Sequence, residues 1–515
     1  MRGTAPWRWI RVLGVAVLFV LCVAPVVALV PALAANTAVV AEALTPRRAG
    51  LLLSSLQLAS VVLVLDSLVA GAAVLWAQTA PRRRAFAVMA ITLAAAFIPP
   101  VAHAAAWAGV GEAVRRALSL SVTPLTGIPA AALAQTTAFL PIAVAIGLAG
   151  VTAIDPSLVD AARIQRPDAS ALRRVILPLA VPAVLAAGGI AALLSLGDEA
   201  VPSAFGVNTA AMELFSSYAS DGNAGATLAL AWPLALVAAA AAFACAGPLR
   251  RVSLRPAWGR SAWSSPPRFD LGTRLVLGLG AALAASAAAV TFGALLVGSG
   301  TPREAVAAVT AAGSDIGTTV MVSATCAVVA GLVGLAAGSP AGAGSPPSRG
   351  VWGLALVAAV LPAPLMGAGL VTLYNTGATS AIYDSIAMPM LASLARFAPL
   401  AALVVAIAAS RLPHGVLEAS LVQVGPVRAY GRVVAPMLAA AAVSGGLIVG
   451  AFAAGELGAT LMVLPPGRST AVVRAFNLLH YGASQEVAAI ALAVASLGVV
   501  AALCGWTIAR RGWAR

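Results

Sequence analysis

The sequence predicts an all-α polytopic membrane protein with about 12 transmembrane helices, and three observations support this fold class. The first is composition: of 515 residues, 61% are hydrophobic and 9% are charged, and the mean hydropathy is +0.98. A soluble chain carries roughly 25% charged residues, so there are too few charges here to cover a water-facing surface. The second is the run length: long stretches of Ala, Leu and Val favour helices over the short alternating strands of a membrane barrel.

The third observation is the distribution of arginine. All 31 basic residues are arginine, and they occur in short clusters between apolar stretches. With the N-terminus in the cytoplasm, 23 arginines fall on the cytoplasmic side and seven on the outer side. This is the bias of the positive-inside rule, and it favours both termini in the cytoplasm. It also accounts for the net charge of +14 without nucleic acid, because no basic stretch carries interleaved aromatic residues.

Twelve apolar stretches satisfy the requirement of about 20 residues for a membrane-spanning helix. A polar, basic and proline-rich segment at 248–270 reads as a linker between a first half, 1–247, and a second half, 271–515. Each half then holds six spans. We expect them at 10–34, 50–78, 85–109, 128–151, 180–203 and 224–246, and at 271–297, 315–337, 350–373, 386–409, 437–462 and 484–508.

Covalent chemistry on the chain itself is not expected. The four cysteines lie within apolar stretches and the three histidines are far apart, so we predict neither a metal site nor a bound cofactor. The chain has no lysine and therefore cannot form the phosphate-binding loop Gly-x-x-x-x-Gly-Lys-Ser/Thr. No nucleophile–base pair is recognisable, so we expect no catalytic residue and no enzyme activity.

The two halves match each other at a constant offset of 258 residues. Acids are scarce in this chain, so acidic pairs that share one offset indicate a duplication. Six spans per half would place both repeats in the membrane in the same direction. The aligned positions are Phe139 with Phe397, Pro141 with Pro399, Asp160 with Glu418, Arg174 with Arg432, Pro178 with Pro436, and Asp198 with Glu456.

A hydrophilic segment follows the fourth predicted span of each half, at 155–178 and at 411–436. Each segment carries the aligned acid and then turns, at Pro167 or Gly425, into an arginine-bearing stretch. We expect each to contain a short helix that opens at the acid, because the positive end of the helix dipole favours an acid there. One such loop could merely fix topology, whereas two copies at the same position favour a function.

These segments resemble the cytoplasmic loop of binding-protein-dependent ABC importer permeases. In that family a Glu-Ala-Ala triplet is followed by a Gly and, further on, by an apolar residue and Leu-Pro. Asp160, Ala161 and Ala162 match the first triplet, and Glu418, Ala419 and Ser420 match the second. Both loops are one residue short of the usual spacing, Arg166-Pro167 stands where the first loop lacks the Gly, and Gly425 is displaced in the second.

A second stretch resembles the iron(III)-type permeases, which are often single chains with two fused halves. It comprises Gly455–Thr460, Pro465-Pro466-Gly467 and Asn477–Gly482. The resemblance implies a type I ABC importer-like permease of a bacterial inner membrane. It also implies two ATP-binding cassette subunits that bind ATP and Mg²⁺, and a substrate-binding protein. Iron(III) is the first expectation for the cargo, with thiamine, polyamine, phosphonate and sulfate open.

Four acids are predicted to contribute to a translocation path. Asp66 lies in the middle of a span, where a carboxylate is costly and usually faces a cavity or a partner; pairing with Arg396 and protonation are both open. Asp198, Glu199 and Glu456 lie near the outer ends of their spans, where they line the path or simply sit at the interface.

The main alternative is a twelve-helix secondary transporter of the major-facilitator type, which also has two parallel six-helix halves. It would need an Asp ahead of the arginines between the second and third spans, and the segment QTAPRRRAFA has none. It would also leave the repeated loops unexplained. A polytopic membrane enzyme is a weaker alternative because no polar catalytic loop stands out, and a purely structural membrane protein is weaker still.

Overall fold

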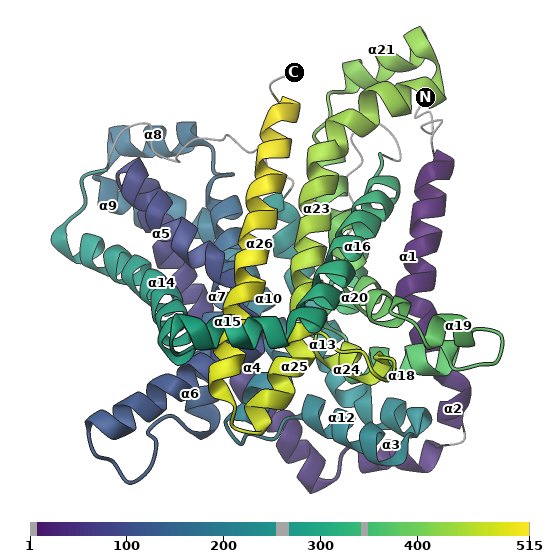
Figure 1. Cartoon of the computed structure of the whole chain (residues 1–515). Coiled ribbons are helices and arrows are strands. Elements are labelled where there is room, and N and C mark those ends of the chain that lie inside the picture. Colours follow the sequence, from purple (N-terminus) through teal and green to yellow (C-terminus); the bar gives the residue numbers. More distant parts are fainter. Residues whose placement is uncertain (1–7, 35, 254–266, 341–348, 514–515) are drawn as a thin grey trace.

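The structure is a computed structural model that describes residues 8–34, 36–253, 267–340 and 349–513. Within these residues the chain is a bundle of helices (Figure 1). The central part of the predicted linker, 254–266, lies outside the described residues.

Ten helical segments of the described chain are long and apolar enough to cross a membrane, or up to twelve if each of two bent pairs is one span. This agrees with the number expected from the sequence. The ten are Arg8–Ala34 (α1, Arg8–Ala28, with α2, Val30–Ala34), Pro46–Thr79 (α4), Gly127–Val151 (α7), Asp168–Leu196, Ala224–Arg251 (in α13, Ala224–Ser253), Leu271–Gly298 (α14), Gly313–Ala337 (α16), Ala387–Ala409 (α20), Pro426–Gly455 and Ser484–Cys504 (in α26, Ser484–Trp513).

The fifth span of each half begins with two short elements. In the first half these are α9 (Asp168–Ala171) and the π-helical turn η2 (Leu172–Ile176), followed by α10 (Leu177–Leu196). In the second half they are α22 (Pro426–Ala429) and the π-helical turn η3 (Tyr430–Val434), followed by α23 (Ala435–Gly455).

The third predicted span of each half is sharply bent, which the expected spans 85–109 and 350–373 did not include. The segments Arg82–Phe97 (α5, Arg82–Ala94, with η1, Ala95–Phe97) and Pro100–Ala117 (α6) meet at 109°. In the second half, α17 (Arg349–Val360) and α18 (Ala363–Tyr374) meet at 86°. Prolines stand at both bends, Pro99-Pro100 and Pro362, where the missing N–H and the ring prevent a continuous helix.

The fifth predicted spans, 180–203 and 437–462, also end early. α10 stops at Leu196 and α23 at Gly455, and each is followed by an acid and a short helix, α11 (Ala200–Ala204) or α24 (Gly458–Val463). The remaining helices are α3 (Thr37–Glu42), α8 (Pro156–Gln165), α12 (Ala210–Asp221), α15 (Pro302–Ala311), α19 (Ser380–Tyr383), α21 (His414–Val424) and α25 (Ala471–His480).

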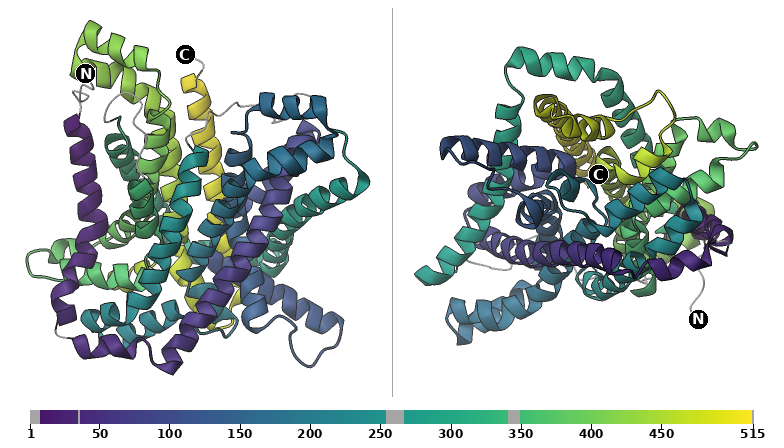
Figure 2. Two further views of the ribbon diagram at one scale, coloured as in Figure 1. Left: turned by 180° about the vertical axis from the view of Figure 1, so that it is seen from behind. Right: turned by 90° about the horizontal axis from the view of Figure 1, so that it is seen from below.

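The first long helix of each half packs against the other half. α1 contacts α16, α18 and α20, whereas α14 contacts α4, α5 and α6. The left view of Figure 2 shows α1, in purple, beside the green helices of the second half. Gly14 makes the approach of α1 to α16 possible, since an added Cβ would overlap the backbone nitrogen of Ala337 and lie 2.8 Å from the carbonyl carbon of Ala336.

α8 and α21 lie at the same end of the molecule, which we call the loop end. The first turn of α1 and the last turns of α26 are also at this end, whereas α3, α6 and α12 lie toward the opposite end (Figure 1).

Candidate functional site

The first candidate site is the pair of helices α8 and α21 at the loop end. Asp155 caps α8 by accepting a hydrogen bond from the backbone N–H of Ser157 at 2.9 Å, and Pro156 occupies the first helical position. The expectation that these helices open at Asp160 and Glu418 is therefore wrong, since both acids lie inside them. An Asp cap followed by Pro is the stronger start signal, because Pro has the helical φ and no N–H left unsatisfied.

Elements of the two segments begin at positions that differ by 258 residues throughout. The π-helical turns are the most specific part of this agreement, because such turns are rare and often mark functional positions. The corresponding starts are 156 and 414 for α8 and α21, 168 and 426 for α9 and α22, 172 and 430 for η2 and η3, and 177 and 435 for α10 and α23.

Each of the two helices has one buried anchor and one strongly exposed apolar residue. Val159 and Leu417 are buried at corresponding positions. Ile164 is 86% exposed and Val422 is 87% exposed, again at corresponding positions. Single exposed apolar residues are ordinary on a protein surface, but a matched pair on two matched helices indicates a surface that is used.

The triplet residues are accessible at this surface with one exception. Asp160 is partly exposed, 4.0 Å from Arg163, which also pairs with Asp168 at 2.8 Å and so connects α8 to α9. Ser420 is buried, and its hydroxyl donates to the Leu417 carbonyl oxygen at 2.8 Å. Ala161, Arg166, Glu418 and Ala419 are exposed, Ala162 is half-buried, and Gly425 has φ +72°, which suits glycine.

The second candidate site is a buried acid–arginine cluster formed by Gln135, Asp198, Glu199, Arg396 and Glu456. Arg396 on α20 donates to the Glu456 carboxylate at 2.6 Å, and the Glu456 side chain is fully buried. Glu456 also accepts from the backbone N–H groups of Ala459 at 3.0 Å and Thr460 at 2.7 Å, and from the Thr460 hydroxyl. The pair is thus neutralised and hydrogen-bonded, as a buried ion pair requires.

The corresponding acid in the first half has an uncharged partner. Asp198 caps α11 by accepting from the N–H of Ala200 at 3.1 Å, and it accepts from the Gln135 amide on α7 at 2.9 Å. The Ser195 hydroxyl donates to the other end of the Gln135 amide at 2.7 Å. In both halves, therefore, the acid after the fifth span connects a short helix to the fourth span.

Glu199 lies where the two halves meet, within electrostatic range of Asp198, Glu456 and Arg396. A Cβ added at Gly458 would overlap its carboxylate oxygen. Added at Gly197, a Cβ would lie 3.8 Å from the Val360 carbonyl oxygen; at Gly455, it would lie 3.7 Å from Pro100. Each fifth span therefore ends against the bent pair of the other half.

The structure gathers three of the four predicted path acids into this cluster and leaves Asp66 outside it. Arg396 pairs with Glu456, so the pairing with Asp66 that the sequence left open is not formed. Both carboxylate oxygens of Asp66 are without a hydrogen-bond partner among the described residues. Within the same part of the chain, no three His, Cys, Asp or Glu side chains are grouped to hold a metal ion.

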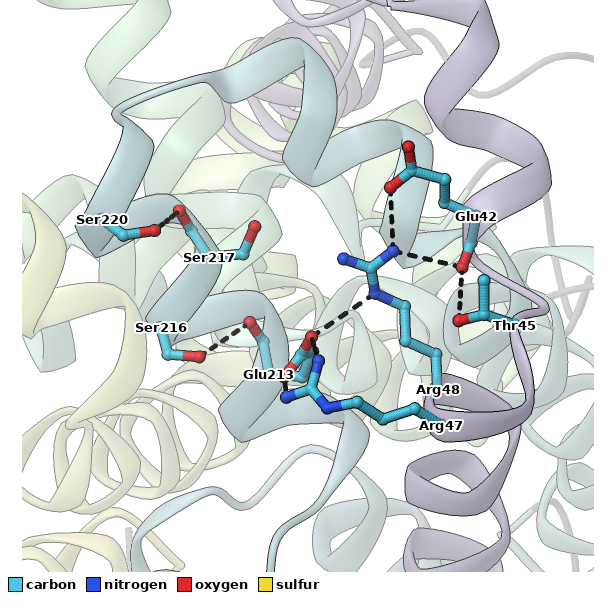
Figure 3. Close-up of polar contacts among 8 residues, drawn as sticks. All are labelled: Glu42, Thr45, Arg47, Arg48, Glu213, Ser216, Ser217 and Ser220. Carbon is cyan, nitrogen blue, oxygen red and sulfur yellow. Dashed lines mark hydrogen bonds and ion pairs between the residues drawn. The ribbon is translucent and has the colours of Figure 1, made fainter.

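An ion-pair network at the opposite end of the molecule was not predicted (Figure 3). Glu213 on α12 accepts from both terminal nitrogens of Arg47, at 2.7 and 2.8 Å, and from Arg48 at 3.4 Å. Arg48 also pairs with Glu42 at 3.1 Å, so the network fastens α12 to the start of α4. A signal was present in the sequence, because these are two of the few arginines expected outside.

We expect Glu213→Ala to destabilise the protein by about 1–3 kcal/mol, because the largely buried Arg48 loses one of its acceptors. Arg47→Ala should cost about 0–1 kcal/mol, since Arg47 is 71% exposed and water replaces its partner. Thermal unfolding of the detergent-solubilised variants measures both. Equal losses would contradict the assignment of Glu213 as the centre of the network.

These features define the chain as a multi-pass helical membrane protein. Comparison with known protein families, with curated proteins and with solved structures finds no match.

Proposed function

We propose that the chain is the permease subunit of an ATP-driven importer of the ABC type. The observation that carries the proposal is the pair of matched helices, α8 and α21, which expose Ile164 and Val422 at the loop end. Two equivalent surfaces on one side of a membrane protein suit two copies of one partner. An ATP-binding cassette subunit on each helix would supply ATP hydrolysis.

The proposed architecture is two parallel six-helix repeats joined by the segment 248–270. The element starts that agree at an offset of 258 residues support it, as do the bent third spans and the short helix after each fifth span. In this reading the loop end is cytoplasmic, both termini are in the cytoplasm, and the membrane is the inner membrane of a bacterial cell.

The proposed mechanism is alternating access around the acid–arginine cluster. Asp198, Glu199 and Glu456 would lie on the translocation path, closed where Glu199 meets Gly458. ATP binding would draw the two ATPase subunits together, swing the halves apart at this junction and open the path to the outer side. A substrate-binding protein would deliver the cargo there; iron(III) remains our first candidate.

The test is co-purification from gently solubilised membranes of the source cells. With wild-type chain we expect a subunit that carries a phosphate-binding loop, identified by mass spectrometry. Ile164→Glu together with Val422→Glu should reduce its recovery by about tenfold or more, since charged groups replace the central apolar contacts.

Tyr481→Glu provides the matched control, because Tyr481 is 88% exposed but follows α25, away from the loop end. It should leave recovery unchanged. If no ATPase subunit accompanies the wild-type chain and uptake instead follows a proton or sodium gradient, the alternative holds. That alternative is a twelve-helix secondary transporter of the major-facilitator type, and the unpartnered intramembrane acid Asp66 is the observation in its favour.

A further inference from the structure

Asp66 is a carboxyl group sealed inside the helix bundle. It stands far from both ends of α4, none of its surface is exposed, and neither carboxylate oxygen has a hydrogen-bond partner among the described residues. A water-sized cavity beside the group would leave part of its surface accessible. Protein atoms therefore pack against the side chain on all sides.

The surroundings of Asp66 are apolar. Val62 and Ala70 lie one turn before and one turn after it on the same face of α4. Val62 packs with Phe139 on α7 and Ala191 on α10, and Ala70 belongs to the cluster that contains residues 140, 143 and 187 of the same two helices. Asp66 thus lies between two apolar clusters, at the interface of α4 with α7 and α10.

Every other charged group near α4 is at the end of a helix. α7 and α10, the helices that face Asp66, contain no acidic, basic or histidine residue. Among the other helices that contact α4, α14 and α5 carry arginines only in their first turns, and α12 carries Glu213 and Asp221 at the α4 N-terminal end. The basic residues of α4 itself, Arg47 and Arg48, are in its first turn and pair with Glu213 and Glu42.

An ionised carboxylate in this position would have no counter-ion, no hydrogen-bond donor and no water, which costs several kcal/mol. The cost is removed when a proton from water forms an O–H bond with one carboxylate oxygen, because the side chain then becomes neutral. The adjacent backbones leave no route for that proton: a Cβ added at Gly188 of α10 would overlap the Ser67 hydroxyl and lie 2.8 Å from the Leu63 carbonyl oxygen.

We propose that Asp66 is a proton-binding site that is occupied in this conformation and exchanges its proton with water only when α4 and α10 separate. Because the ionised form is tolerated only in a separated conformation, protonation favours the packed interface and ionisation favours the open one. The inference rests on the packing of α4 and does not depend on the proposed ATPase partners.

Infrared spectroscopy of the purified chain in lipid, labelled with ¹³C at aspartate carboxyl groups, tests the protonation. We expect the carbonyl stretch of a protonated aspartate in apolar surroundings at neutral pH, its loss in Asp66→Asn, and its retention in Glu304→Gln, which alters an exposed acid of α15. If Asp66→Asn does not fold, Asp66→Glu serves instead, because the signal then moves to the unlabelled position. A carboxylate signal from Asp66 at neutral pH would overturn the proposal.

Transfer into D₂O tests the exchange, because replacing the proton by deuterium shifts the same band. Exchange should be slow in the wild type and faster by about tenfold or more in Gly188→Ala, whose added methyl group forces α4 from α10. Gly278→Ala is the control, since its Cβ would meet nothing within 4 Å. Immediate exchange in the wild type, or no change in Gly188→Ala, would show that separation of α4 and α10 does not control the proton.

Discussion

Replacing Arg396 with Met is expected to lower the free energy of unfolding by about 3–5 kcal/mol, the cost of leaving a buried charge without its partner. The Glu456 side chain has no exposed surface and would keep only its bonds from residues 459 and 460. Thermal or denaturant unfolding in detergent measures the loss. It should be the largest effect of any single ion-pair substitution in this chain.

The double variant Arg396→Met with Glu456→Gln separates charge from packing. Gln keeps one oxygen that can accept from the Thr460 N–H, and the pair becomes neutral, so most of the stability should return. The pair Arg474–Asp315, at 3.0 Å but with Arg474 35% exposed, is the comparison, and Arg474→Met should cost less. If Arg396→Met and the double variant unfold alike, burial of an unpaired charge is not the cause.

Gly458→Ala should destabilise the protein by about 1–3 kcal/mol and loosen the contact between the two halves. The added Cβ would overlap the Glu199 carboxylate and lie 2.6 Å from the Ala363 Cβ at the start of α18. The Glu199 side chain can swing aside, but α18 cannot move without shifting the bend next to it. Hydrogen exchange of the backbone amides at 197–204, together with thermal unfolding, reports both effects.

Gly313→Ala is the matched control, because Gly313 is also the first residue of its helix and its added Cβ would meet nothing within 4 Å. Ala has the higher helix propensity, so this variant should be neutral or slightly more stable. Protected amides at 197–204 in Gly458→Ala would contradict a tight junction at Glu199.

The sequence predicted the number and approximate position of the spans because each depends on a local property, the length of an apolar run. It did not predict the bends at Pro99-Pro100 and Pro362, since an apolar window has the same composition whether the helix is straight or broken. The early ends of α10 and α23 had a local signal, the glycines at 197 and 455, which a hydropathy window does not weigh.

The candidate site divides in the same way. The offset of 258 residues is a pattern along the chain, and it located both loop segments before their helices were seen. The ion pair of Arg396 with Glu456 spans 60 residues, and that of Arg47 with Glu213 spans 166. Such pairs depend on which helices become neighbours, and the sequence offered Asp66 as readily as Glu456 for Arg396.

The exchange of first helices between the halves also has a consequence for biosynthesis. α1 is made first, yet the helices that it contacts, α16, α18 and α20, belong to the second half. During synthesis α1 therefore waits in the lipid, covered by hydrocarbon chains rather than protein, until α16 has entered the membrane. For this helix the order of insertion and the order of packing are reversed, and the close approach at Gly14 is a late step of folding.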